Sequence, residues 1–186
     1  FKPLVVNVVN KEGGSFKLSH ENEYFTKIEE SFKDLRTAAK KSKMTNDLLT
    51  SFAISCTGDK IPSHFSSQRK WLDKTYMNEL IGYSDQKAFV KFLGNYTCFF
   101  RSIWNDYKGT DLTKIPLLNG ADQSDLASLL LLYLNESNHK MAITILAPAY
   151  HRVIEGEEGS VVDFINTTKT LAAFYPLWRT TRSNSG

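Results

Sequence analysis

Hydrophobic side chains recur along most of the chain at the spacing of an amphipathic helix. In the segment 21–35, Phe25, Ile28 and Phe32 lie three and four residues apart and are separated by charged positions, which places them on one helical face. The same period continues in six further segments, at residues 46–55, 64–80, 84–107, 124–135, 139–155 and 161–178. The pattern therefore predicts an all-α fold of about seven helices in an irregular bundle.

The first twenty residues follow a different pattern. The stretch LVVNVV, at residues 4–9, is rich in β-branched side chains and leads into the turn signal KEGG at residues 11–14. A β-branched run followed by paired glycines favours a strand or a hairpin. Because a lone hairpin is marginal in water, we expect residues 1–20 to form an extended arm that continues from an upstream domain or docks on the helices.

One polar stretch interrupts the helical pattern near the middle of the chain. The sequence KGTDLTKIPLLNGADQ, at residues 108–123, is rich in the residues that form turns and loops. It predicts a boundary between a first helical layer, residues 21–108, and a second layer, residues 109–186, packed together as one compact unit. Within the second layer, residues 124–135 are apolar almost all round, which predicts a buried central helix.

Composition adds few constraints to this picture. Of the 186 residues, 41% are hydrophobic and 12% aromatic, as in ordinary globular domains. The net charge of +3 permits a local nucleic-acid-binding patch and does not by itself argue for one. No stretch approaches the roughly 18 apolar residues of a membrane span. The two cysteines could form a disulfide or stay reduced, so a cytoplasmic location fits the composition.

Sequence motifs of known chemistry are absent from the chain. There is no phosphate-binding loop, no dinucleotide-binding glycine motif and no nucleophile elbow. The four histidines are scattered, and neither Cys56 nor Cys98 belongs to a C-x-x-C pair, so a zinc site is not expected. We therefore expect no catalytic residue, bound cofactor or metal ion within this chain.

Two short clusters combine positive charge with aromatic residues. The first, SSQRKW, carries Arg69 and Lys70, and the second, FYPLWRTTRSNSG, carries Arg179 and Arg182. Arginine and lysine beside small polar residues are typical of contacts to phosphate oxygens. Both clusters also have a purely structural interpretation, because Arg69 can pair with Asp73 one turn away and arginines near a helix C-terminus favour the macrodipole. Spacing alone leaves both interpretations open.

Several stretches, in order along the chain, resemble one large bacterial protein family. They are FKPLVVNVVN…YFTKIEESF, TNDLLTSFAISCTGDKI, HFSSQRKWLDKTY and FINTTKTLAAFYPLWRTTRSNSG. They are similar to the central helical region of proteins with an N-terminal ParB/sulfiredoxin-like domain and, in many members, a C-terminal HNH nuclease domain. GmrSD-type modification-dependent restriction systems belong to this family. The family's Asp-Gly-Gln-Gln-Arg and HNH motifs are not found here, so the resemblance carries no catalytic residue onto this chain.

The resemblance implies a cytoplasmic phage-defence protein that uses a nucleoside triphosphate and a divalent metal outside this segment. Because the chain starts at Phe1 without a methionine, we expect it to be a segment excised from such a protein. Its expected role is a non-catalytic connector that engages DNA, including modified duplexes, and contacts the flanking domains. The DNA-contact candidates are Arg69, Lys70, Arg179 and Arg182, with Tyr175, Leu177 and Trp178 packed inward.

Two other functions stay open. A helical protein-interaction module, or one that forms a homo-oligomer, would expose an apolar patch and would associate independently of salt. A self-contained enzyme would instead bring titratable side chains together in one pocket.

Overall fold

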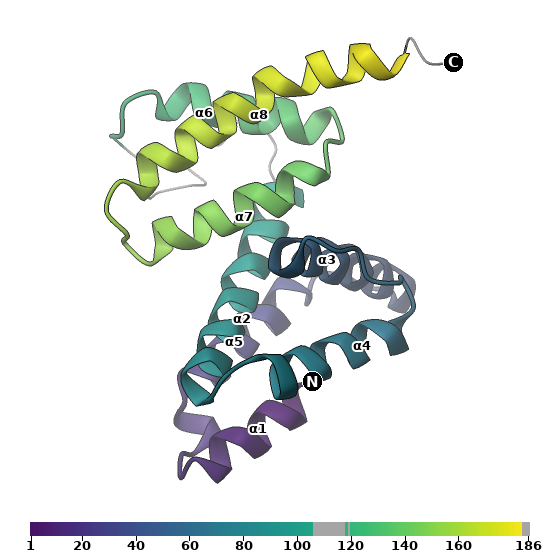
Figure 1. Cartoon of the computed structure of the whole chain (residues 1–186), viewed down its shortest axis with the longest axis vertical. Helices are drawn as coiled ribbons and strands as arrows, with labels where there is room; N and C mark the ends of the chain where they lie inside the picture. Colours follow the sequence, from purple (N-terminus) through teal and green to yellow (C-terminus); the bar gives the residue numbers. More distant parts are fainter. Residues whose placement is uncertain (106–117, 119, 184–186) are drawn as a thin grey trace. The chain divides into compact units, whose positions relative to one another are not determined.

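The segments with a helical hydrophobic period form helices (Figure 1). The structure is a computed structural model that describes residues 1–105, 118 and 120–183, with the side chains of 181–183 excepted. No strand occurs in these ranges, so the all-α prediction is confirmed. The α-helices are α1 (Lys2–Lys11), α2 (His20–Ser31), α3 (Ala38–Thr57), α4 (Phe65–Lys74), α5 (Tyr83–Cys98), α6 (Ser124–Glu136), α7 (Met141–Ile154) and α8 (Ser160–Ser183). Shorter helical segments are η1 (Phe16–Leu18), with 3₁₀ geometry, and η2 (Thr75–Glu79) and η3 (Phe99–Asn105), with π geometry.

The prediction of an extended arm at the start of the chain is wrong, because residues 2–11 form α1. Pro3 lies in the first turn, where its missing N–H costs nothing. Val5 and Val9 are four residues apart and are both fully buried, at 0% and 1% exposure. Burial of this face outweighs the small helix penalty of β-branched residues.

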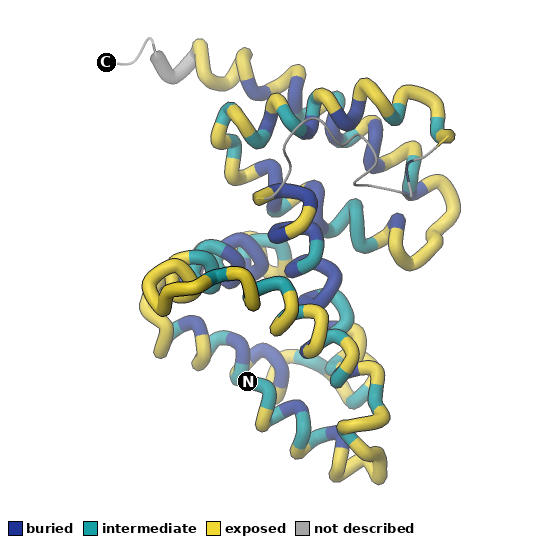
Figure 2. The backbone as a smooth tube through the Cα atoms, turned by 180° about the vertical axis from the view of Figure 1, so that it is seen from behind, coloured by how far each residue is buried: buried dark blue, intermediate teal, exposed yellow. Residues whose placement is uncertain are grey.

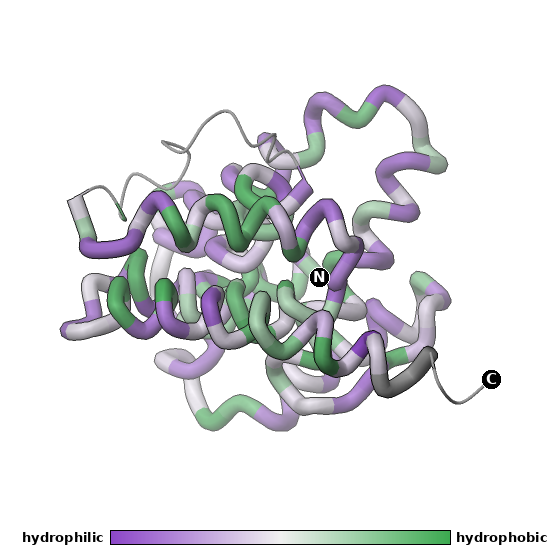
Figure 3. The backbone as a smooth tube through the Cα atoms, turned by 90° about the horizontal axis from the view of Figure 1, so that it is seen from above, coloured by the Kyte–Doolittle hydropathy of each residue, from purple (hydrophilic) through white to green (hydrophobic). Residues whose placement is uncertain are grey.

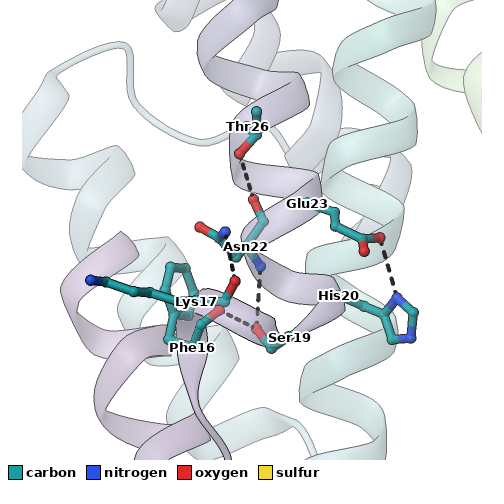
Figure 4. A network of polar contacts seen from close by, with 7 residues as sticks. All are labelled: Phe16, Lys17, Ser19, His20, Asn22, Glu23 and Thr26. Carbon is teal, nitrogen blue, oxygen red and sulfur yellow. Dashed lines mark hydrogen bonds and ion pairs between the residues drawn. The ribbon is translucent and has the colours of Figure 1, made fainter.

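The start of α2 is fixed by a capping residue and its neighbours. The Ser19 hydroxyl accepts a hydrogen bond from the Asn22 backbone N–H at 3.3 Å and donates one to the Phe16 carbonyl at 2.9 Å (Figure 4). The Asn22 side-chain amide donates to the Lys17 carbonyl at 3.3 Å. These bonds satisfy free donors at the helix terminus and tie η1 to α2.

Helix α3 begins earlier than the hydrophobic period predicts. The period begins at residue 46, but the helix is capped by Thr37, whose side chain accepts from the Lys40 N–H at 3.2 Å. The added turns are polar, so they carry no hydrophobic period that could reveal them. The helix ends at Gly58, which has the left-handed φ of 77° that glycine adopts easily after a helix.

The chain divides into two units, Phe1–Cys98 and Phe99–Gly186, which are described separately below. The predicted boundary between layers, after residue 108, lies outside the described residues, as does most of the predicted loop at 108–123. No helix in the described ranges is both long and apolar enough to cross a membrane.

The N-terminal unit is built around aromatic side chains. The Phe52 ring of α3 lies 5.2–5.4 Å, between centroids, from the rings of Phe89, Phe92 and Tyr96 on α5. Helix α2 packs along α5 at Gly94, where an added Cβ would lie 2.8 Å from the Cβ of Tyr24. The close approach of these two helices therefore requires glycine at this position.

The C-terminal unit packs α6 and α7 against α8. Its core includes Phe99, Leu134, Leu146 and Phe164, each at most 1% exposed. The prediction that residues 124–135 form a helix buried on all sides is wrong for one face, where Leu126, Leu129 and Tyr133 are 40–54% exposed. Figure 3 draws the hydrophobic positions of the chain in green. The exposed fractions place those of this face of α6 on the surface of the unit.

Candidate nucleic-acid interface

The first turns of α3 carry a dense run of basic residues. Four of the eight residues from Arg36 to Lys43 are basic, and every residue of this run is exposed, so the run is yellow in Figure 2. The run lies in the N-terminal unit, which contains 15 basic and 11 acidic residues, whereas the C-terminal unit contains eight and nine. The positive charge of the protein is therefore concentrated in the unit that carries this run.

Helix stability does not explain these lysines. Lys40 and Lys41 lie in the first turn or just after it, and no acidic residue occupies the first turn of α3. The helix macrodipole places positive potential at this end, so a lysine here is unfavourable by roughly 0.3–1 kcal/mol. An acidic partner for the lysines would offset this cost, but among the described residues Arg36, Lys40, Lys41 and Lys43 form no ion pair.

A part-buried hydrogen bond joins α4 to α3 just after this run. The side-chain amide of Gln68, only 1% exposed, donates to the Asn46 side-chain oxygen of α3 at 2.6 Å. Lys43 precedes Asn46 by three residues and so lies on the same side of α3. Arg69 and Lys70 follow Gln68 directly and are exposed.

We name the exposed basic residues at the start of α3 and on the neighbouring helix α4 the basic surface. It consists of Arg36, Lys40, Lys41, Lys43, Arg69 and Lys70. Two of its members, Arg69 and Lys70, are predicted site residues. Arg69 also makes the alternative contact that the spacing allows, an ion pair with Asp73 at 3.6 Å. The Arg69 side chain is 66% exposed, and an exposed pair of this kind contributes little stability, so it leaves the guanidinium accessible.

The remaining members of the basic surface were missed by the sequence prediction. The run from Arg36 to Lys43 follows a segment in which the hydrophobic period fades. Because it has no apolar face, the hydrophobic pattern does not mark it as part of a helix. The signal that identifies it is the density of basic residues within a short window.

The second predicted cluster lies at the end of α8, where Arg179 makes contacts within the chain. The Arg179 guanidinium donates to the Tyr175 hydroxyl at 3.0 Å and lies 5.9 Å from the centre of the Tyr175 ring. The Tyr175 hydroxyl in turn donates to the Ser137 carbonyl at 2.8 Å, which ties α8 to the end of α6. The side chain of Arg182 lies outside the described residues.

The inward packing that we expected for the aromatic end of α8 holds only in part. Tyr175 is buried at 7% exposure, but Leu177 is 67% exposed and Trp178 is 38% exposed. Phe174, at 53%, lies three and four residues before them and shares their side of the helix. We name these three residues the α8 apolar strip. In Figure 1 this part of α8 extends beyond α6.

Two further sets of polar groups are engaged with one another. A hollow of about 490 Å³ between α7 and α8 contains Arg152, which pairs with Glu157 at 2.7 Å and Asp163 at 3.3 Å. In the N-terminal unit, the Tyr83 hydroxyl donates to the buried carboxylate of Glu21 at 2.8 Å. Burial and this hydrogen bond raise the pKa of Tyr83 to about 12, so its hydroxyl stays protonated as a donor at neutral pH.

No group of three or more histidine, cysteine, aspartate or glutamate side chains is arranged to hold a metal ion within the described ranges.

Comparison of the chain with protein-family models and with curated proteins finds no match. The basic surface of the N-terminal unit is therefore the feature on which a functional proposal can rest.

Proposed function

We propose that the chain is a non-catalytic helical module that engages DNA, with the phosphate backbone bound on the basic surface. The observation that carries this proposal is the group of exposed cations on α3 and α4, of which Lys40 and Lys41 lie at a helix end where they are unfavourable for folding. Phosphate contacts of this kind supply sequence-independent affinity. Binding would recover the electrostatic free energy that these lysines cost the isolated helix.

The resemblance to the family with ParB/sulfiredoxin-like and HNH domains extends this proposal. In it, the chain connects the nucleotide-dependent and nuclease ends of a cytoplasmic restriction protein and contacts DNA between them. The nucleoside triphosphate and divalent metal belong to the flanking domains of that larger protein. The basic surface supports the DNA-engaging part of this role through Arg69 and Lys70. Arg179, which is exposed and also bonded to Tyr175, and Arg182 stay predicted contacts.

A binding titration tests the proposal. Fluorescein-labelled duplex DNA is titrated with the 186-residue chain at low ionic strength, and fluorescence anisotropy is recorded. The triple variant Lys40→Ala/Lys41→Ala/Lys43→Ala should lose at least about tenfold in affinity, because three phosphate contacts are removed. The matched control removes three exposed lysines of the same unit that lie elsewhere in the sequence: Lys11→Ala/Lys17→Ala/Lys87→Ala.

The two triple variants separate a local interface from a general charge effect. If the control loses as much affinity as the α3 variant, the binding follows net charge and the basic surface is not the interface. Absence of binding by the wild-type chain at low salt would refute the DNA-engaging function altogether.

A protein-interaction function is the second candidate, and the α8 apolar strip is the observation that favours it. Leu177 and Phe174 are more than half exposed on one side of α8, and apolar side chains grouped in this way are typical of protein contacts. Sedimentation velocity of the wild-type chain and of Leu177→Asp tests self-association. A salt-insensitive oligomer that Leu177→Asp dissociates would support this candidate, whereas monomers at all concentrations would exclude self-association.

A further inference from the structure

An exposed aromatic side chain, Phe65, lies on α4, the helix that carries Arg69 and Lys70 of the basic surface. Phe65 is the first residue of α4 and is 69% exposed. Among the phenylalanine, tyrosine and tryptophan side chains of residues 1–98, all of which the structure describes, Phe65 alone is classed as exposed. Every other such ring of this unit contributes at least in part to the interior, so the position of Phe65 requires a separate explanation.

Packing of α4 does not supply that explanation. The helix buries Gln68 and Leu72, and Trp71 contacts the Phe52 ring at 6.1 Å between centroids. Phe65 takes part in no ring contact within the described residues. A phenylalanine left in water gains none of the roughly 1.5–3 kcal/mol that burial of its side chain would provide.

The neighbours of Phe65 are those of a nucleic-acid contact. Arg69 lies four residues further along α4 and therefore on the same side of the helix as Phe65. Gln68, three residues after Phe65, makes the hydrogen bond to Asn46 of α3, which follows Lys43 by three residues. The residues on either side, His64 and Ser66, are exposed and leave the ring accessible.

We propose that Phe65 stacks on an unpaired base, so that the basic surface binds single-stranded nucleic acid in preference to a duplex. An aromatic ring among cations is the arrangement by which proteins hold single strands, because the cations follow the backbone while the ring stacks on a base. Bases in an intact duplex are stacked on one another and offer no free face to Phe65. This inference rests on the proposed function, since it assigns the form of nucleic acid that the same surface binds.

The test compares labelled oligothymidine with a duplex of equal length, using the 186-residue chain. Phe65→Ala should lower the affinity for oligothymidine by about 5- to 150-fold, the range measured for loss of one stacked base, and should leave duplex affinity unchanged. Phe65→Trp should retain the affinity, because indole stacks at least as well. Phe65→Leu should behave like alanine, because leucine keeps apolar volume without a π face.

Two controls make the result specific. Phe174→Ala removes an exposed phenylalanine from the C-terminal unit, at 53% exposure, and should change neither affinity. The dependence of oligothymidine affinity on salt should have the same slope for wild type and Phe65→Ala, because stacking releases no counterions.

The outcomes distinguish this inference from the function on which it rests. If duplex is bound and Phe65→Ala leaves both affinities unchanged, stacking is refuted while DNA engagement stands, and Phe65 would be a contact for another protein. If Phe65→Leu binds oligothymidine as tightly as the wild-type chain, the contact is apolar and not stacking, and the inference fails. If the wild-type chain binds neither probe at low salt, the inference and the proposed function fail together.

Discussion

Replacement of Lys40 by glutamate should stabilise the fold and weaken DNA binding at the same time. Lys40 is the third residue of α3, and its backbone N–H donates to the Thr37 side chain at 3.2 Å. Glutamate at this position completes a capping box, because its carboxylate can accept from the backbone N–H of Thr37. It also replaces an unfavourable interaction with the helix macrodipole by a favourable one.

The expected gain is about 1 kcal/mol in the free energy of unfolding, since each dipole interaction contributes roughly 0.3–1 kcal/mol. With a urea dependence of about 1–3 kcal/mol per molar, the midpoint of urea unfolding should rise by roughly 0.3–1 M. Far-UV circular dichroism follows the transition. The same variant should bind duplex DNA more weakly than wild type, because a phosphate contact becomes a repulsion.

Lys43→Glu is the matched comparison, because it makes the same change of charge in the second turn of α3. It should weaken DNA binding to a similar extent without the full gain in stability, since dipole and capping effects are confined to the first turn. A Lys40→Glu variant that unfolds at a lower urea concentration than wild type would refute the electrostatic account of α3. Unchanged DNA affinity would refute the role of Lys40 in binding.

Three further predictions concern the fold itself. Gly94→Ala should lower the free energy of unfolding by about 1–3 kcal/mol, because the new Cβ would lie 2.8 Å from the Tyr24 Cβ; urea unfolding measures the loss. Tyr83→Phe should cost about 1–3 kcal/mol in the same assay, because the buried Glu21 carboxylate loses a donor. Burial lowers the pKa of His139 below its usual 6.5. The free energy of unfolding should therefore be steady above that pH and fall as the pH drops through it, and His139→Gln should reduce this fall.

Each of these predictions has a result that contradicts it. A Gly94→Ala protein as stable as wild type would mean that α2 and α5 do not approach as closely as the structure shows. Tyr133→Phe is the control for Tyr83→Phe, because Tyr133 is 40% exposed and its hydroxyl can bond to water. Equal losses from the two tyrosine variants would argue against a special bond to Glu21. If the free energy of unfolding of His139→Gln falls with pH as that of the wild type does, the titrating group is not His139.

The hydrophobic period predicts the helices well where one face is apolar, and less well elsewhere. It locates α2, α5 and α7, whose apolar faces are regular. The prediction for α1 was wrong because it followed the strand propensity of the β-branched residues. The four-residue spacing of Val5 and Val9 is the helical signal. It also misses the first turns of α3, where polar residues are ordered by a cap at Thr37 and not by burial.

The candidate site was only partly predictable for a similar reason. The cluster SSQRKW is enough to predict Arg69 and Lys70 as candidate contacts. Their helix is joined to α3 by the hydrogen bond between Gln68 and Asn46, 22 residues apart, which no local pattern predicts. The contact of Arg179 with Tyr175 could be predicted, because the two residues are four apart on one helix. The hydrogen bond from Tyr175 to a carbonyl 38 residues earlier leaves no pattern in the local sequence. The sequence therefore could not show that Arg179 contacts a residue that joins α8 to the end of α6.

The salt dependence of binding tests the central claim most directly. The logarithm of the affinity of the wild-type chain for duplex DNA is measured against the logarithm of salt concentration, beside the Lys40→Ala/Lys41→Ala/Lys43→Ala variant. If the basic surface contacts about four phosphates, the wild-type slope should be about −4 and the variant slope shallower by about 2–3. A wild-type affinity that does not change with salt, or equal slopes for the two proteins, would contradict a phosphate-binding role for the basic surface.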